Sequence, residues 1–122
     1  MTQPLALVCY EKLLPGSQVV NRLQDLGYRV RALDDAGSLS GCAEREKPLV
    51  VLADLDTVGA CEAIARLKNG TSTGHLPVIA FAGPDQAGMQ AAARDAGATL
   101  VVSASGLLPQ LEELLDQALE VR

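Results

Sequence analysis

Asp54 is the side chain of this sequence that is best placed for chemistry, because it directly follows an apolar run at residues 49–53. Asp56 is close in sequence, and Glu11 and Asp85 follow two other apolar runs. Glu11, Asp54 and Asp56 could form a loose site for a divalent cation, which prefers oxygen ligands. Alternatively, Asp54 caps the helix that follows it, and the other three are solvated loop carboxylates. We favour the second interpretation.

Four further side chains are candidates for binding or reactivity. Cys9 ends the first apolar run, and a reactive thiol there would need a nearby cation such as Lys12 to lower its pKa. Ser103 and Ser105 could bind an anion at the start of the last helix, although a simple helix cap explains them equally well. His75 is the only histidine and lies in a loop rich in Gly, Thr and Ser, so we expect a surface residue.

The composition indicates one domain, residues 1–122, with an aliphatic core. Apolar residues make up 48% of the 122 residues and aromatic residues only 2%. A chain of this length can bury a core without metals or disulfides. Cys9, Cys42 and Cys61 show no C-x-x-C pairing, so we expect reduced, buried thiols rather than a zinc site or a disulfide framework.

Charge and motifs exclude several classes of function. The formal net charge is −5 and no Lys/Arg cluster stands out, which disfavours direct binding to nucleic acid or to an anionic membrane. The first apolar run, Leu5–Cys9, is too short for a secretory core or a membrane span, so we expect a cytoplasmic protein. The sequence has no nucleotide-binding glycine motif and no nucleophile elbow. We therefore predict neither an enzyme nor a bound cofactor.

The elements that must position these side chains alternate regularly between apolar runs and amphipathic stretches. That alternation predicts an α/β fold, a doubly wound parallel sheet with helices on both faces. The strands are expected at Leu5–Cys9, Arg29–Leu33, 49–53, Val78–Ala82 and 99–102.

The helices are expected between these strands. Ser17 is a plausible cap and Gly27 a stop for the first helix, while residues 35–46 predict only a short or irregular helix because they are rich in Gly and Ser. The third helix should end near 69–70, and the fourth should run from Asp85 to Ala96, with Gly97 after it. The last should be continuous and turn these residues inward: Leu107, Leu108, Leu111, Leu114, Leu115, Ala118 and Leu119.

In such sheets the functional crevice lies beyond the carboxyl ends of the strands. The positions that should line it fall at residues 9–12, 54–57, 82–85 and 103–105.

Three stretches of the sequence resemble the receiver domain of bacterial two-component response regulators, and their order and spacing cover essentially the whole chain. Residues 23–30 resemble the first helix of that family and its Gly-Tyr step into the second strand. Residues 48–54 resemble the run from a proline to the phospho-accepting aspartate, and residues 76–82 and 93–98 resemble the fourth strand and a later Ala-Gly-Ala turn. The resemblance implies a three-layer flavodoxin-like fold with strand order 2-1-3-4-5.

The resemblance also implies a phosphotransfer site, of which Asp54 is the residue clearly retained. The acidic pair that would hold Mg²⁺ falls on Cys9 and Tyr10, which are not oxygen-anion ligands of the kind Mg²⁺ prefers. The hydroxyl that follows the phosphoryl group is replaced by Ala82, and the lysine position falls near Ala104. The family's usual dimer and effector surface, formed by the fourth helix with Arg94, the fifth strand and the last helix, is implied as an interaction face.

Three hypotheses follow from this pattern. The favoured one is a phosphorylation-independent, degenerate receiver-like module that binds a protein partner or itself. The alternative is an atypical but functional phosphoacceptor, modified at Asp54 through Mg²⁺ held by Glu11, Asp54 and Asp56. A third hypothesis is a piece of a larger multidomain regulator.

Overall fold

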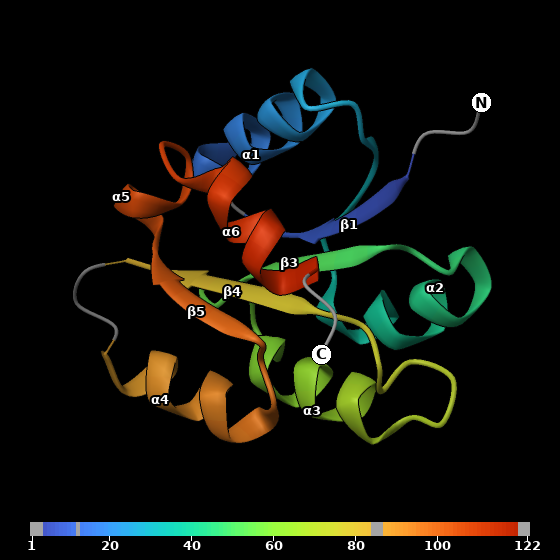
Figure 1. The fold of residues 1–122 in the computed structure, drawn as a ribbon. Coiled ribbons are helices and arrows are strands. Elements are labelled where there is room, and N and C mark those ends of the chain that lie inside the picture. The colour runs from blue at the N-terminus through green and yellow to red at the C-terminus, as the bar shows by residue number, and fades with distance from the viewer. Residues whose placement is uncertain (1–3, 12, 84–86, 120–122) are drawn as a thin grey trace.

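The strands form one parallel sheet, which positions the described candidate residues at its edges. The computed structural model describes residues 4–11, 13–83 and 87–119. The strands are β1 (Leu5–Cys9), β2 (Arg29–Leu33), β3 (Val50–Asp54), β4 (Val78–Ala82) and β5 (Leu100–Ser103). Their order is β2-β1-β3-β4-β5, with every pairing parallel (Figure 1). The α/β fold class and the strand order predicted from the sequence are therefore confirmed.

Helices cover both faces of the sheet. The helical segments are α1 (Leu13–Asp25), a 3₁₀ turn η1 (Ala36–Ser38), α2 (Leu39–Glu46), α3 (Ala60–Asn69), α4 (Ala87–Ala96), α5 (Ala104–Leu107) and α6 (Leu111–Leu119). One core cluster joins α2, α3 and α4 to one face, and the other joins α1, α5 and α6 to the opposite face. In the part of the chain that is described, no helix is long and apolar enough to cross a membrane.

The core is built from aliphatic side chains, as the composition predicts. Every residue of β1, β3 and β4 is buried, which is typical of parallel strands covered on both faces. Alternate residues point to opposite layers, so Leu7 and Val51 pack toward α2 and α3, whereas Val8 and Leu52 pack toward α1 and α6. Phe81 is the fully buried aromatic side chain of the second cluster.

Two strands end one residue later than the apolar runs predict. The pairing of β3 with β4 continues to Asp54, which lies opposite Phe81, and that of β5 with β4 continues to Ser103, which lies opposite Ala82. The backbone hydrogen bonds of the neighbouring strand, rather than side-chain polarity, set these ends. Asp54 and Ser103 are therefore held by the sheet itself.

The prediction that Ser17 caps the first helix is wrong. Helix α1 begins at Leu13, so Ser17 lies inside it. Pro15 is tolerated in the first turn because the N–H groups there have no acceptor within the helix. The predicted stop is confirmed, since Gly27 follows with a φ of +94°.

The prediction of one continuous last helix is also wrong. The chain forms the short α5, a turn through residues 108–110, and then α6. Pro109 accounts for the break, because it has no N–H to donate and its ring clashes with the preceding turn of a helix. The inward face is largely as predicted: Leu107, Leu111, Leu114, Leu115 and Ala118 are buried, and Leu108 and Leu119 are half-buried.

The remaining helix predictions agree with the structure where it can be compared. Residues 36–46 form the expected short, irregular element, in which the Asp35 carboxylate accepts a hydrogen bond from the Gly37 N–H at 2.9 Å. Helix α3 ends at Asn69 and α4 ends at Ala96. The proposed cap Asp85 lies outside the described residues.

Two glycines give a matched test of this backbone. Gly97 has a φ of +110°, and a Cβ there would lie 2.8 Å from Cγ of Lys68, so Gly97→Ala should lower the free energy of unfolding by about 1–2 kcal/mol. Gly88 is an exposed position in α4 with nothing within 4 Å of an added Cβ. Because alanine favours the helix more than glycine does, Gly88→Ala should raise the free energy of unfolding by about 0.5 kcal/mol. Urea denaturation measures both, and changes of the same sign would contradict the described geometry.

Candidate functional site

The carboxyl ends of the strands meet at one edge of the sheet, at the left in Figure 1. The register places Cys9 opposite Ala53, Asp54 opposite Phe81, and Ala82 opposite Ser103. The described residues of the predicted crevice are therefore gathered at this edge. Lys12 and Asp85 lie outside the described residues, so their predicted places in the crevice stay predictions.

Asp54 is buried and engaged in the turn that follows β3. Its side chain is 3% exposed, and its Oδ1 accepts a hydrogen bond from the backbone N–H of Asp56 at 2.9 Å. The Asp54 carbonyl oxygen also accepts from the N–H of Thr57 at 3.0 Å. This is the turn that an aspartate forms with the backbone two residues on, and it fixes the loop between β3 and α3.

Glu11 ties two loops of the crevice together. Its Oε1 accepts a hydrogen bond from the backbone N–H of Val58 at 2.9 Å, across 47 positions of sequence. Glu11 is exposed, and Val58 is an apolar side chain that is 83% exposed at the crevice rim. The Glu11 carboxylate thus holds the loop after β1 against the loop after β3, a contact that the sequence did not predict.

Tyr10 packs against the core. Its side chain is half-buried and lies against the cluster shared by β1 and α1. A Cβ on Gly16 of α1 would overlap the Tyr10 ring, so glycine at this helical position makes room for the ring. The backbone N–H of Tyr10 donates to the Leu33 carbonyl oxygen at 2.8 Å.

Cys9 is a protonated thiol at neutral pH. It is fully buried, and burial, followed by the negative charges of Asp35, Glu11, Asp54 and Asp34, raises its pKa to about 11. A thiolate is the nucleophilic and metal-binding form of cysteine. These surroundings therefore oppose the reactive-thiol role.

The described carboxylates at this edge do not form a ligand set that fits a magnesium ion. Among residues 4–11, 13–83 and 87–119, no group of three or more His, Cys, Asp or Glu side chains is placed to hold a metal ion. The sequence suggested a metal site formed by Glu11, Asp54 and Asp56. The structure does not bring these three side chains together into such a group. Glu11 and Asp54 instead accept backbone hydrogen bonds from the chain.

The ends of β4 and β5 carry small side chains. Ala82 is 1% exposed and has no hydroxyl, and Ala104 begins α5. Ser103 caps α5 by accepting a hydrogen bond from the Gly106 N–H at 3.3 Å, and its hydroxyl lies 3.3 Å from that of Ser105. The helix-cap interpretation is therefore confirmed for Ser103, whereas Ser105 lies inside α5 and contacts the Ser103 hydroxyl.

Sequence reasoning placed Thr57 among the crevice residues but did not predict that it is buried. Its side chain is 3% exposed, and its Oγ1 is the buried side-chain oxygen for which the described residues offer no hydrogen-bond partner. A threonine in a polar loop gives no sequence signal of burial, because burial here depends on the packing of the short loop onto Asp54.

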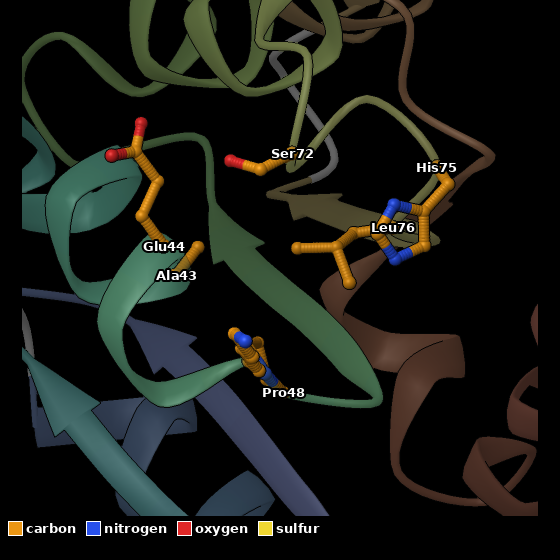
Figure 2. A pocket seen from close by; sticks show the side chains of 7 residues that line it. Ala43, Glu44, Pro48, Ser72, His75 and Leu76 are labelled. Atoms are coloured by element: carbon orange, nitrogen blue, oxygen red, sulfur yellow. The ribbon is translucent and has the colours of Figure 1, made fainter.

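Cavities lie at the margins of this edge and at the opposite edge. One of about 350 Å³ lies between Tyr10, Glu11 and Asp34, beside the end of β2. His75 is exposed, as predicted, and lies at the opposite edge, where it lines a cavity of about 320 Å³ (Figure 2).

The fold is similar to that of receiver domains, although no protein-family model matches the sequence and no curated protein matches it at a significant level. The receiver domain of a sensor histidine kinase from Pseudomonas aeruginosa, solved with a magnesium ion in its active-site cleft, has a TM-score of 0.87 and 18% identity, covering 97% of this chain and 98% of that one. The signal receiver domain of a modulated diguanylate cyclase from Desulfovibrio desulfuricans has a TM-score of 0.81 and 22% identity, covering 97% and 94%. A chemotaxis response regulator of Vibrio cholerae has a TM-score of 0.76 and 18% identity, covering 93% and 99%. These likenesses show that the chain has the receiver fold.

The raised pKa of Cys9 predicts a loss of stability at alkaline pH. The unfolded thiol ionises near its ordinary pKa of 9.0 and the folded thiol near 11. The free energy of unfolding therefore keeps its full value below pH 9 as far as Cys9 is concerned. It falls by roughly 2–3 kcal/mol as pH rises through 11, because the Cys9 thiol of the unfolded chain releases its proton first. Urea denaturation at several pH values measures this loss.

Two variants separate this effect from other groups that titrate at high pH. Cys9→Ala should lose the part of the slope that belongs to Cys9, whereas Cys42→Ala removes another buried thiol and should retain it. If Cys9→Ala and the parent lose stability in parallel between pH 9 and 11, the surroundings described for Cys9 are wrong.

Proposed function

We propose that this chain is a degenerate receiver-like domain that acts as a phosphorylation-independent protein-interaction module in cytoplasmic signal transduction. The receiver fold supports the signalling role. The crevice supports the independence from phosphorylation. The proposal rests on Cys9 and Asp54. Cys9 is a buried, protonated thiol at the position where the resemblance to receivers implies a metal-binding acid. The neighbouring Asp54 accepts a hydrogen bond within its own turn.

Phosphoryl transfer depends on neutralising the charge that spreads over the transferred group. Here burial and, after it, the negative charges of four carboxylates raise the pKa of the Cys9 thiol; the four are Asp35, Glu11, Asp54 and Asp34. Ala104 brings no ammonium group to the site and Ala82 brings no hydroxyl. A phosphoryl group on Asp54 would therefore add negative charge to a cluster that is already negative.

The two edges of the sheet differ in a way that supports one of them as the partner surface. Edge strand β2 exposes Arg29 and Arg31, and Arg31 pairs with Glu46 at 3.7 Å. Edge strand β5 is half-buried along its length, and Leu100–Ser103 has three aliphatic side chains and no charge. Charged side chains protect an edge strand from pairing, and apolar ones do not. We therefore propose that the face formed by α4, β5, α5 and α6 binds a protein partner or a second copy.

An analogue of the phosphorylated aspartate tests the first part of the proposal. Amide NMR spectra of the labelled domain should not change when Mg²⁺ and beryllofluoride are added, because the described residues of the crevice do not form the ligand set that both need. The Pseudomonas receiver domain that coordinates magnesium is the positive control. Saturable shifts centred on Asp54, Ala82 and Ser103 would overturn the proposal and establish the phosphoacceptor alternative.

Charge reversal tests the second part. Arg94 is exposed on α4, and Arg94→Glu should weaken association through this face about tenfold or more while leaving the fold intact. Arg66→Glu makes the same charge reversal at an exposed position of α3, outside this face, and should have little effect on association. Sedimentation measures self-association, and calorimetric titration measures binding to an isolated partner. Association that survives substitutions across the whole face would rule out this surface.

A further inference from the structure

A second candidate binding site lies at the amino edge of the sheet, opposite the crevice. A cavity of about 320 Å³ lies between α2, the segment that leads into β3, and the loop between α3 and β4, and Figure 2 shows the side chains that line it. Pockets that hold small ligands begin at about 300 Å³. The cavity shares no residue with the crevice, so its use does not depend on the chemistry of Asp54.

The cavity combines an apolar floor with a polar rim that carries both signs of charge. Ala43, Pro48 and Leu76 are buried and form the floor. The rim is made of the exposed residues Glu44, Lys47, Ser72 and His75. Glu44 and His75 lie at opposite sides, and Ser72 lies nearer Glu44 (Figure 2).

The loop that forms one wall is held in place by hydrogen bonds. The buried Thr73 hydroxyl donates to the Leu67 carbonyl oxygen at 2.7 Å, and Lys68 Nζ donates to the Leu76 carbonyl oxygen at 2.8 Å. A Cβ on Gly74 would lie 2.9 Å from two backbone carbonyl oxygens, so this turn is closely packed. A wall that is fixed before binding lowers the entropic cost of holding a ligand.

Lys47 is the residue of this rim whose backbone carries strain. Within residues 4–11, 13–83 and 87–119 it is the one non-glycine residue with a positive φ, at +51°. Helices commonly end on a left-handed residue, but that residue is usually glycine because a Cβ is unfavourable there. Residues with strained backbone cluster at active sites and at sites that hold ligands.

We propose that this cavity binds a small zwitterionic molecule with an apolar side group, of which a free aliphatic α-amino acid is the simplest example. The Glu44 carboxylate pairs with the ligand ammonium group, and the Lys47 ammonium group, with His75, pairs with the ligand carboxylate. The aliphatic group rests on Pro48 and Leu76. A zwitterion can pair with both Glu44 and Lys47. A ligand with a single charge would leave one of these two side chains without an opposite charge.

Leucine is the probe, and NMR titration of the labelled domain is the measurement. Leucine should give saturable shifts at the amides of Lys47, Ser72 and Leu76, while Asp54 and Ser103 stay unchanged. N-acetylleucine lacks the ammonium group and leucinamide lacks the carboxylate, so each should bind about fivefold more weakly, as expected for the loss of an exposed ion pair. The absence of saturable shifts, or equal binding of either derivative, would overturn the proposal.

Substitutions assign the two charges separately. Glu44→Gln should weaken the binding of leucine about fivefold but leave the binding of N-acetylleucine unchanged. Lys47→Gln should weaken the binding of leucine but leave the binding of leucinamide unchanged. Glu113→Gln, on the exposed face of α6, is the control and should change neither. Lys47→Gly should also weaken the binding of leucine. It should nevertheless raise the melting temperature of the protein by about 3 °C, because glycine adopts the left-handed conformation without the strain that a Cβ causes. Variants that fold normally and bind all three molecules like the parent would refute the assignment.

Discussion

Burial of the three central strands on both faces is the constraint on which the rest of the structure depends. All residues of β1, β3 and β4 are buried between the two helical layers. A slip of one residue would move every side chain of a strand to the wrong layer, so the register is strongly fixed. Because the strands are parallel, that register also sets which residues meet at the carboxyl edge. Core packing therefore determines that Cys9, Asp54 and Ala82 lie together.

At that edge the chain uses its own carboxylates to organise its loops. Asp54 accepts a hydrogen bond from its own turn, and Glu11 accepts one from the loop after β3. Cys9 fits these surroundings because a neutral thiol adds no charge where Asp35, Glu11, Asp54 and Asp34 already act on it. A carboxylate in its place would increase the repulsion unless a cation compensated it. These contacts give the described carboxylates at this edge a structural role.

The surfaces away from the crevice carry the features that suit recognition. Edge strand β5 presents aliphatic side chains, whereas edge strand β2 presents arginines. The amino edge carries a cavity with a fixed wall, a buried apolar floor and a strained lysine. Neither surface includes Asp54.

The sequence by itself determined the α/β class, three of the strands to the residue, and the convergence of residues near 9, 54, 82 and 103, because apolar periodicity is a local property of the chain. It failed at Ser17, because α1 already begins at Leu13, and at the continuous last helix, because the chain turns at Pro109 between α5 and α6. Tertiary structure alone decided the hydrogen bond from Val58 to Glu11, the burial of Thr57 and the cavity beside Lys47. Each of these joins segments far apart in sequence or depends on loop packing, and periodicity carries no information about either.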